Sequence, residues 1–431
     1  MNSDMDEYRA DEGTGVPGGS RRGSLRNLRT FTSLKNAAYR VYLAAMASEM
    51  AAMNMQLVAR SVLVYRLTGS AAILGGIALA NAVPMLFLAL FGGVIADRVQ
   101  KKHVIVVGHV ASAVASLGIA FSLTTGYLSA AHEGSWWILI AAAVFQGAVM
   151  GLIMPSRESL IREIVSAEHL LNAISLNDMG VNSLRLFAPA LTGFLIDAFD
   201  FAAVYYVMAG TYLLAALFMV FLPHISEIAT SKASVLTNIM EGFRYIRRET
   251  TIRFVLIFLL LGIVLSQPYI LLMPVFCDDI LKKGATGMGI LMSVSGAGAI
   301  VGSLILASLP NRKRGLIMLV STVLLGVSLA AFSLSESWPV SLGVIVFVGL
   351  GQTGLMAVSG TLIQYYVDPK YLSRVISILM MQFGLISFGT FAAGLLAEAV
   401  GVQWAVGGFA IALALVAVSA LAFATRVRNL E

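Results

Sequence analysis

The sequence predicts an all-α polytopic membrane protein, with twelve transmembrane helices in two six-helix halves. Three observations predict this fold class. Of the 431 residues, 58% are hydrophobic and only 12% are charged, and the apolar residues gather in runs of about 20, which is the length that spans a bilayer. A soluble protein of this length has no interior large enough for so much apolar surface. The composition therefore excludes a water-soluble fold, a disordered chain and a disulfide scaffold.

Each apolar run has the length of one membrane span and is followed by a polar connection. The twelve runs have the approximate limits 41–64, 71–95, 104–126, 136–155, 173–197, 201–222, 252–276, 286–309, 315–334, 338–366, 373–398 and 402–424. An even number of spans places both termini on the same side of the membrane.

These runs divide the chain into five regions. A polar tail, residues 1–38, starts acidic, turns basic and is expected to be partly disordered. Six helices follow in residues 39–222, and six more in residues 252–424, before a short tail at 425–431. The linker, residues 223–251, carries Val235, Ile239, Phe243 and Ile246 at helical spacing. We expect an amphipathic helix there, lying on the membrane surface.

The basic residues indicate the orientation. If both termini are cytoplasmic, 24 of the 29 lysines and arginines lie on the cytoplasmic side and three lie on the other, while Arg60 and Arg185 lie inside helices. Cytoplasmic loops carry such an excess of Lys and Arg. We therefore expect a multi-pass protein of the inner (cytoplasmic) membrane with both termini in the cytoplasm. The net charge of +6 is explained by topology, so no nucleic-acid partner is expected.

An internal repeat supports the division into halves. When the chain is shifted by 202 residues, six residues between 160 and 175 fall on identical residues between 362 and 377. Both windows contain the end of the fourth helix of a half and the start of the fifth. Related halves in parallel orientation are a recurrent plan of membrane transporters.

The connection between the second and third helices carries a recognisable motif. Its residues Gly93, Asp97, Arg98, Lys101 and Lys102 resemble the G-x-L-A-D-R-x-G-R-[KR] loop of the major facilitator superfamily. In that family the aspartate gates transport by meeting the start of the eleventh helix, and a helix N-terminus favours a carboxylate. The alternative is a solvated basic loop that only fixes topology.

The fifth helix carries a second motif, formed by Gly180, Pro189 and Gly193. It resembles the antiporter motif of the same superfamily, which would make this helix pliable and limit leakage. Close helix packing through small residues is the alternative. The segments 63–70, 154–157 and 241–248 are similar to the exporter branch that includes siderophore and drug exporters. Ala143 departs from the arginine that drug antiporters often carry at this position.

The resemblance implies a secondary active transporter that exports a small amphipathic compound, drug-like or siderophore-like, by alternating access and proton antiport. Its expected partners are this substrate, protons and the lipid bilayer, and it is expected to act as a monomer without a cofactor or metal. An uptake carrier or uniporter of the same fold is the nearest alternative. A transport-inactive sensor or scaffold is an alternative of another class. No catalytic constellation or phosphate-binding loop occurs in the sequence, so we expect no enzyme.

Ionisable residues at membrane depth are costly and are candidate functional groups. Glu49 and Arg60 lie on one face of the first helix, and Asp178 and Arg185 lie on one face of the fifth. The helical rise places Glu49 and Arg185 near the midplane, so an ion pair between them is geometrically possible. Either these four residues couple transport to protons, or they form a structural ion-pair network.

Several glutamines in the apolar runs are further polar candidates. They would line the same cavity or form hydrogen bonds between helices. They are Gln56, Gln146, Gln267, Gln352 and Gln382.

Overall fold

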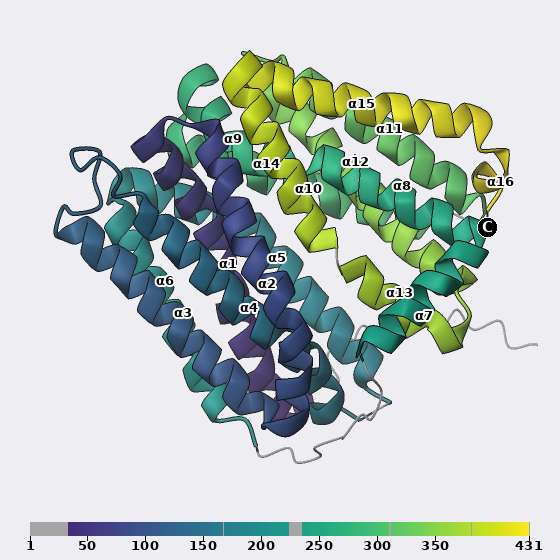
Figure 1. Ribbon diagram of the computed structural model, residues 1–431, viewed down its shortest axis with the longest axis horizontal. Coiled ribbons are helices and arrows are strands. Elements are labelled where there is room, and N and C mark those ends of the chain that lie inside the picture. Colours follow the sequence, from purple (N-terminus) through teal and green to yellow (C-terminus); the bar gives the residue numbers. More distant parts are fainter. Residues whose placement is uncertain (1–32, 167, 224–234, 310–311, 381, 431) are drawn as a thin grey trace, which may run out of the picture.

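The computed structural model describes residues 33–166, 168–223, 235–309, 312–380 and 382–430, with their side chains except at 90–98, 158–159, 162, 171, 235–239, 373, 377, 380 and 383. Regular structure in this described part is helical (Figure 1). Ten described segments are long and apolar enough to cross a membrane. The two other spans that the sequence predicts lie in α1, whose hydropathy is lowered by Glu49 and Arg60, and in α13 with α14.

The N-terminal half contains six helices, which occupy the left and lower parts of Figure 1. They are α1 (Ala37–Thr68), α2 (Ala71–Arg98), α3 (Lys101–Thr124), α4 (Trp137–Ile164), α5 (Leu170–Ala198) and α6 (Phe201–Val220). Helix α1 begins at Asn36, whose side chain accepts hydrogen bonds from the backbone N–H groups of Ala38 and Tyr39 and so caps the helix. It ends at Gly69, whose φ of 63° suits a residue without a side chain.

The C-terminal half occupies the upper right of Figure 1. Its helices are α8 (Thr250–Ser266), α9 (Pro268–Val275), α10 (Gly284–Ser308), α11 (Arg314–Ser333), α12 (Trp338–Tyr366), α13 (Pro369–Met380), α14 (Gln382–Val400) and α15 (Val402–Phe423). A π-helical turn, Phe276–Ile280, follows α9, and the short α16 (Thr425–Arg428) follows α15. The eleventh predicted span is therefore two helices, α13 and α14, and the seventh is α8 continued by α9.

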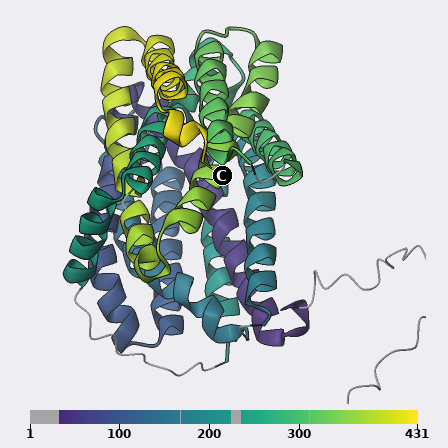
Figure 2. The same cartoon turned by 90° about the vertical axis from the view of Figure 1, so that its right-hand side faces the viewer.

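The segment between the halves contains a helix, α7 (Val235–Arg248). It packs on α13 and α8 of the C-terminal half, and Figures 1 and 2 both show it beside α13. The Tyr245 and Tyr371 rings stack with centroids 4.4 Å apart, and Glu241 forms an ion pair with Arg374 at 3.0 Å. Part of the apolar face of α7 is thus buried against the protein, whereas Phe243 remains exposed.

The two halves meet at one end of the bundle, here named the closed end. There α5 packs against α10, and α2 packs against α14. A Cβ atom at Gly193 would lie 2.2 Å from the Ala285 carbonyl oxygen, and one at Gly289 would lie 2.3 Å from the Pro189 carbonyl oxygen. The backbones of α5 and α10 are therefore in direct contact, and this contact requires glycine at both positions.

Charged side chains surround the closed end. Arg66 forms ion pairs with Asp278 at 3.1 Å and with Asp197 at 3.6 Å. The Tyr65 hydroxyl donates a hydrogen bond to Asp279, and the Ser70 hydroxyl donates one to Glu398 at 3.0 Å. Apart from Arg66 with Asp197, these contacts join the N-terminal to the C-terminal half, so polar groups add to the backbone contact.

At the opposite end, here named the open end, the halves diverge toward the lower right of Figure 1. There α13 packs on α7, within the C-terminal half. The molecule therefore has the two-half arrangement that the sequence predicts, sealed at one end.

Candidate functional site

Among the described acidic side chains of the N-terminal half, Glu49 is the one that is fully buried. Helix α1 carries it three turns beyond its first residue, and its side chain is fully buried, with 0% of its surface exposed. A carboxylate in such a place must have compensating partners, because an isolated buried charge is too costly.

Two partners from two other helices meet this carboxylate. The Arg157 Nη1 atom of α4 donates a hydrogen bond to Glu49 Oε1 at 3.2 Å. The His109 Nε2 atom of α3 lies 3.3 Å from Glu49 Oε2, and His109 is only 1% exposed. Each oxygen of Glu49 therefore faces one nitrogen group, and three helices converge on one buried ionisable trio.

Further polar groups extend this trio inside the same half. The Tyr212 hydroxyl of α6 donates a hydrogen bond to Gln56 Oε1 at 3.0 Å. The Gln146 amide of α4 donates one to the Ser112 hydroxyl at 3.2 Å. Arg60, nearer the C-terminal end of α1, interacts electrostatically with Tyr212 and with Tyr205. The polar face of α1 is thus turned toward the core of its own half.

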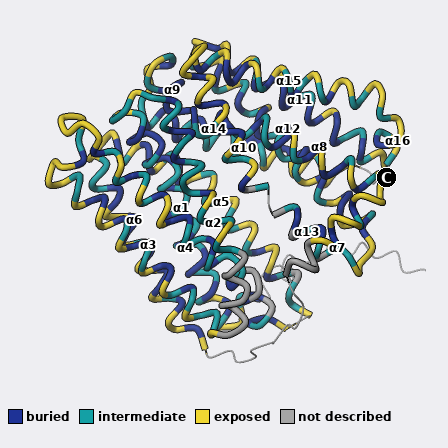
Figure 3. The backbone as a smooth tube through the Cα atoms, in the orientation of Figure 1, coloured by how far each residue is buried: buried dark blue, intermediate teal, exposed yellow. Residues whose placement is uncertain are grey.

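The charges of α5 lie elsewhere. Asp178, Asn182 and Arg185 are exposed, and they share one helix face with Pro189 and Gly193. Toward the closed end this face packs on α10, and a Cβ atom at Gly296 would lie 3.5 Å from the Leu186 Cα atom. Toward the open end the residues of the same face are exposed, and Figure 3 colours the backbone of the molecule by this exposure. Asp178, Asn182 and Arg185 therefore face the space between the diverging halves.

This arrangement corrects the ion pair that spacing alone allowed. In this structure Glu49 contacts Arg157 and His109, and Arg185 is an exposed residue of α5. The four intramembrane charges form two groups, because α1 turns its polar face inward and α5 turns its own toward the other half.

Sequence reasoning missed His109 and Arg157. His109 is one of five histidines that show no metal-ligand spacing, and Arg157 follows the fourth predicted span, 136–155, in a connection that the basic residues place in the cytoplasm. However, α4 continues through Pro155 to Ile164, so Arg157 belongs to the helix and reaches Glu49. The resemblance of segment 154–157 to the exporter branch is the signal in the sequence that could have indicated a role for Arg157.

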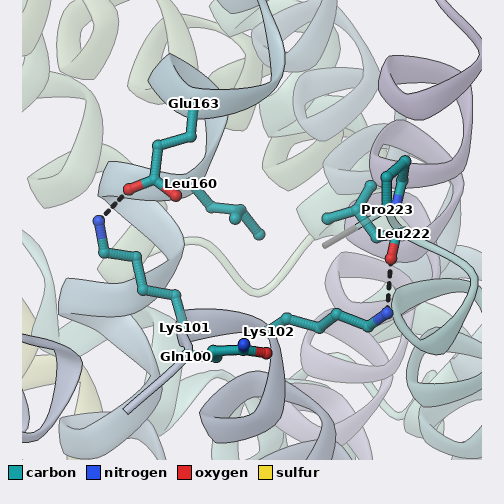
Figure 4. A pocket seen from close by; sticks show the side chains of 7 residues that line it. All are labelled: Gln100, Lys101, Lys102, Leu160, Glu163, Leu222 and Pro223. Carbon is teal, nitrogen blue, oxygen red and sulfur yellow. Dashed lines mark hydrogen bonds and ion pairs between the residues drawn. The ribbon is translucent and has the colours of Figure 1, made fainter. Parts of the chain in front are cut away.

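The loop motif is only partly described. Helix α2 continues through Gly93 and Asp97 to Arg98, and the side chains of these residues lie outside the described part. Lys101 pairs with Glu163 of α4, and Lys102 donates to the carbonyl oxygen of Leu222, at the end of α6. Figure 4 shows both lysines beside a small pocket between these helix ends. Both described basic residues of the motif are thus bonded within their own half.

The remaining candidates differ in burial. Gly193 and Pro189 form the α5–α10 contact, whereas a Cβ atom at Gly180 would only reach ordinary contact with Leu43 at 4.0 Å.

Gln146 is 4% exposed and packs inside the N-terminal half, so it does not line the opening in this structure. Gln267, Gln352 and Gln382 are half-buried in the C-terminal half.

Comparison with known proteins identifies the class of this arrangement. A family model described as transmembrane secretion effector matches residues 28–431. The MFS-type transporter YfiS of Bacillus subtilis is 27% identical over 75% of this chain and 78% of its own length. The staphyloferrin A transporter of Staphylococcus aureus is 21% identical over 77% of this chain and 83% of its own. The enterobactin exporter EntS of Shigella flexneri is 23% identical over 64% of this chain and 63% of its own.

Solved structures agree on the fold. The nucleoside transporter NupG aligns with a TM-score of 0.69 over 90% of this chain and 99% of its own, at 15% identity. A bacterial homologue of the lysosomal transporter Spinster, in an inward-facing conformation, aligns with a TM-score of 0.67 over 91% of this chain and 99% of its own, also at 15% identity. The fold is therefore that of membrane transporters.

Proposed function

The chain belongs to the transmembrane secretion effector family of major facilitator transporters, and from this premise we propose that it exports a small amphipathic compound from the cytoplasm by proton antiport. The related proteins include an exporter of enterobactin and a transporter of staphyloferrin A. These names favour a siderophore-like or drug-like compound as the substrate class.

The excess of basic residues supports a cytoplasmic position for the open end. The lysines at 101 and 102, the basic residues of α7 and Arg374 lie toward the open end, and Lys282 and Lys283 lie toward the closed end. Cytoplasmic segments carry such an excess. In that orientation the conformation is inward-facing, both termini are cytoplasmic, and a compound enters the opening from the cytoplasm.

The exposed face of α5 is the observation that carries the proposal. Asp178, Asn182 and Arg185 are exposed on the α5 face that packs on α10 farther along the helix, and they begin where the α5–α10 contact ends. Polar groups at this depth that face the opening mark a substrate pathway. Rocking the halves together would cover the same groups and present them to the other side, as alternating access requires.

Glu49 is the proposed proton-binding carboxylate. Its side chain is buried in the N-terminal half, whereas the side chain of its partner Arg157 is 18% exposed. Arg157 therefore connects the buried carboxylate to the accessible surface. A carboxylate in contact with such an arginine suits reversible protonation, because the arginine pairs with the ionised carboxylate and can turn toward water when the carboxylate is protonated.

Transport in proteoliposomes tests the proposal. Purified protein is reconstituted, and a pH gradient of either direction is imposed in the presence of a panel of lipophilic cations, macrolides and siderophores. Proton antiport predicts accumulation of at least one compound against its gradient, only when protons flow the opposite way. Accumulation with protons flowing in the same direction would favour the uptake carrier, and flux without dependence on the gradient would favour a uniporter.

The variant Glu49→Gln tests the carboxylate. It keeps the shape of the side chain but cannot ionise, so it should still exchange the transported compound across the membrane while losing uphill transport. The matched control is Glu163→Gln, which removes a paired carboxylate of α4 near the open end and should keep uphill transport. If Glu49 is only a counter-ion, the unpaired Arg157 should destabilise the protein by about 3–5 kcal/mol. A stable Glu49→Gln protein with wild-type uphill transport would exclude Glu49.

A further inference from the structure

His109 is a buried ionisable group to which neither motif assigns a role. It lies on α3, is 1% exposed, and its Nε2 atom is 3.3 Å from Glu49 Oε2. Neither ring nitrogen makes a hydrogen bond of normal geometry with a described residue, and the same is true of Glu49 Oε2. An imidazole that only filled space would normally satisfy at least one nitrogen, because buried polar groups are almost always hydrogen-bonded.

The geometry points to a proton that His109 and Glu49 share, held between His109 Nε2 and Glu49 Oε2, as the transported proton of this antiporter. This inference rests on the proposed proton antiport and adds a second residue to its proton site. The proton comes from the aqueous phase, binds to one of these two atoms, and leaves to the aqueous phase on the other side. No bond between heavy atoms changes.

The charges around the pair limit it to one extra proton. Glu49 from α1 and Arg157 from α4 cancel when the carboxylate is ionised and His109 is neutral. Among the described residues, the titratable Tyr212 from α6 also lies against His109, with ring centroids 6.5 Å apart. One added proton gives the trio a net charge of +1, which burial disfavours. A second proton would add another uncompensated buried charge.

Arg157 offers the way to relieve that charge. Its side chain is 18% exposed, whereas those of Glu49 and His109 are 0% and 1% exposed. When a proton occupies the pair, the carboxylate has less negative charge to offer Arg157. The arginine then gains by turning toward water, so protonation changes the contact between α1 and α4.

Histidine suits this task because a neutral imidazole has one nitrogen that accepts a proton and one that donates a proton. The pair therefore places a nitrogen that can take up a proton beside a carboxylate that holds negative charge. An amide at either position keeps the shape and removes the exchange.

The proton itself serves as the probe in the test. Wild-type proteoliposomes on a solid-supported electrode receive a jump from about pH 8 to about pH 6, which covers the range in which imidazole titrates, with no substrate present. Proton binding to a buried site should give a transient charge displacement. The displacement should fall to the background of empty liposomes in His109→Gln, in His109→Asn and in Glu49→Gln. His103→Gln is the matched control, since His103 lies on the same helix and is exposed, and it should keep the wild-type signal.

The outcomes separate the inference from the proposed function. A wild-type signal that is retained in both folded His109 variants and lost in Glu49→Gln would overturn the role of His109 and leave proton antiport standing. The absence of a signal in the wild type would overturn both. A second readout is exchange of the compound that the flux panel identifies. The His109 variants should still exchange it, with a rate that no longer depends on pH, whereas a purely structural histidine would leave the pH profile unchanged.

Discussion

Glu49 could be selected from the sequence as a buried acid, but the residues that it contacts could not. Helical spacing and depth were enough to select it as the deep acid of the first helix. Its partners could not be predicted, because Arg157 lies 108 positions away in sequence and the contact depends on how α1, α3 and α4 rotate about their own axes. Helix α1 is apolar around most of its circumference, so its sequence does not define which face packs on which neighbour. Pro155 also suggested an end to the fourth helix that the structure does not have.

Cys277 provides a residue-scale prediction. It is the only cysteine in the sequence, it is 0% exposed, and it lies at the closed end beside Asp278 and Asp279. If the closed end faces the outside, as proposed, a membrane-impermeant maleimide added outside should therefore leave the wild-type protein nearly unlabelled. Labelling should appear when the closed end opens, and mass spectrometry of intact protein measures it. Labelling only from the cytoplasmic side would contradict the assigned orientation.

Among the elements, the contact between α5 and α10 decides whether the closed end stays sealed. In Gly289→Ala the added methyl group would approach the Pro189 carbonyl oxygen, which lies 2.3 Å from the ideal Cβ position. Overpacking of this kind costs about 1–3 kcal/mol. The balance should move toward the outward-facing conformation by about 5- to 150-fold. The rate of external maleimide labelling at Cys277 measures this shift.

The control for this variant is Gly210→Ala on α6. Nothing lies within 4 Å of a Cβ atom at Gly210, so the substitution should leave labelling unchanged and stabilise the helix slightly. Equal labelling of the two variants would show that the backbone contact does not hold the closed end.

At the scale of the whole molecule, two kinds of interaction compete to hold the halves together. Arg66 is 36% exposed in its ion pairs, and an exposed ion pair contributes only about 0.2–1 kcal/mol. In Arg66→Gln, labelling of Cys277 should therefore rise by less than about tenfold, and less than in Gly289→Ala. If Arg66→Gln opens the closed end as far as the glycine variant, the ion pairs rather than the backbone contact carry the closure.

Much of the fold could be predicted because hydropathy and repetition act over long stretches of chain. Helices α4 and α12 begin at residues 137 and 338, and α6 and α15 begin at 201 and 402, so both pairs are offset by 201 residues. That agrees with the shift of 202 found in the sequence. The division of the eleventh span into α13 and α14, and the docking of α7 on α13, could not be predicted, because both depend on side-chain contacts such as that of Tyr245 with Tyr371.

The docking of α7 also determines what joins the halves covalently. Since α7 packs with the C-terminal half, the connection is reduced to the residues between Pro223 and Val235. This segment has eleven residues, and a chain of that length reaches at most about 40 Å. The covalent connection therefore sets an upper limit on the separation of the halves. In thermodynamic terms the protein is a pair of subunits that share one chain, and each conformation lasts only as long as their mutual contacts favour it.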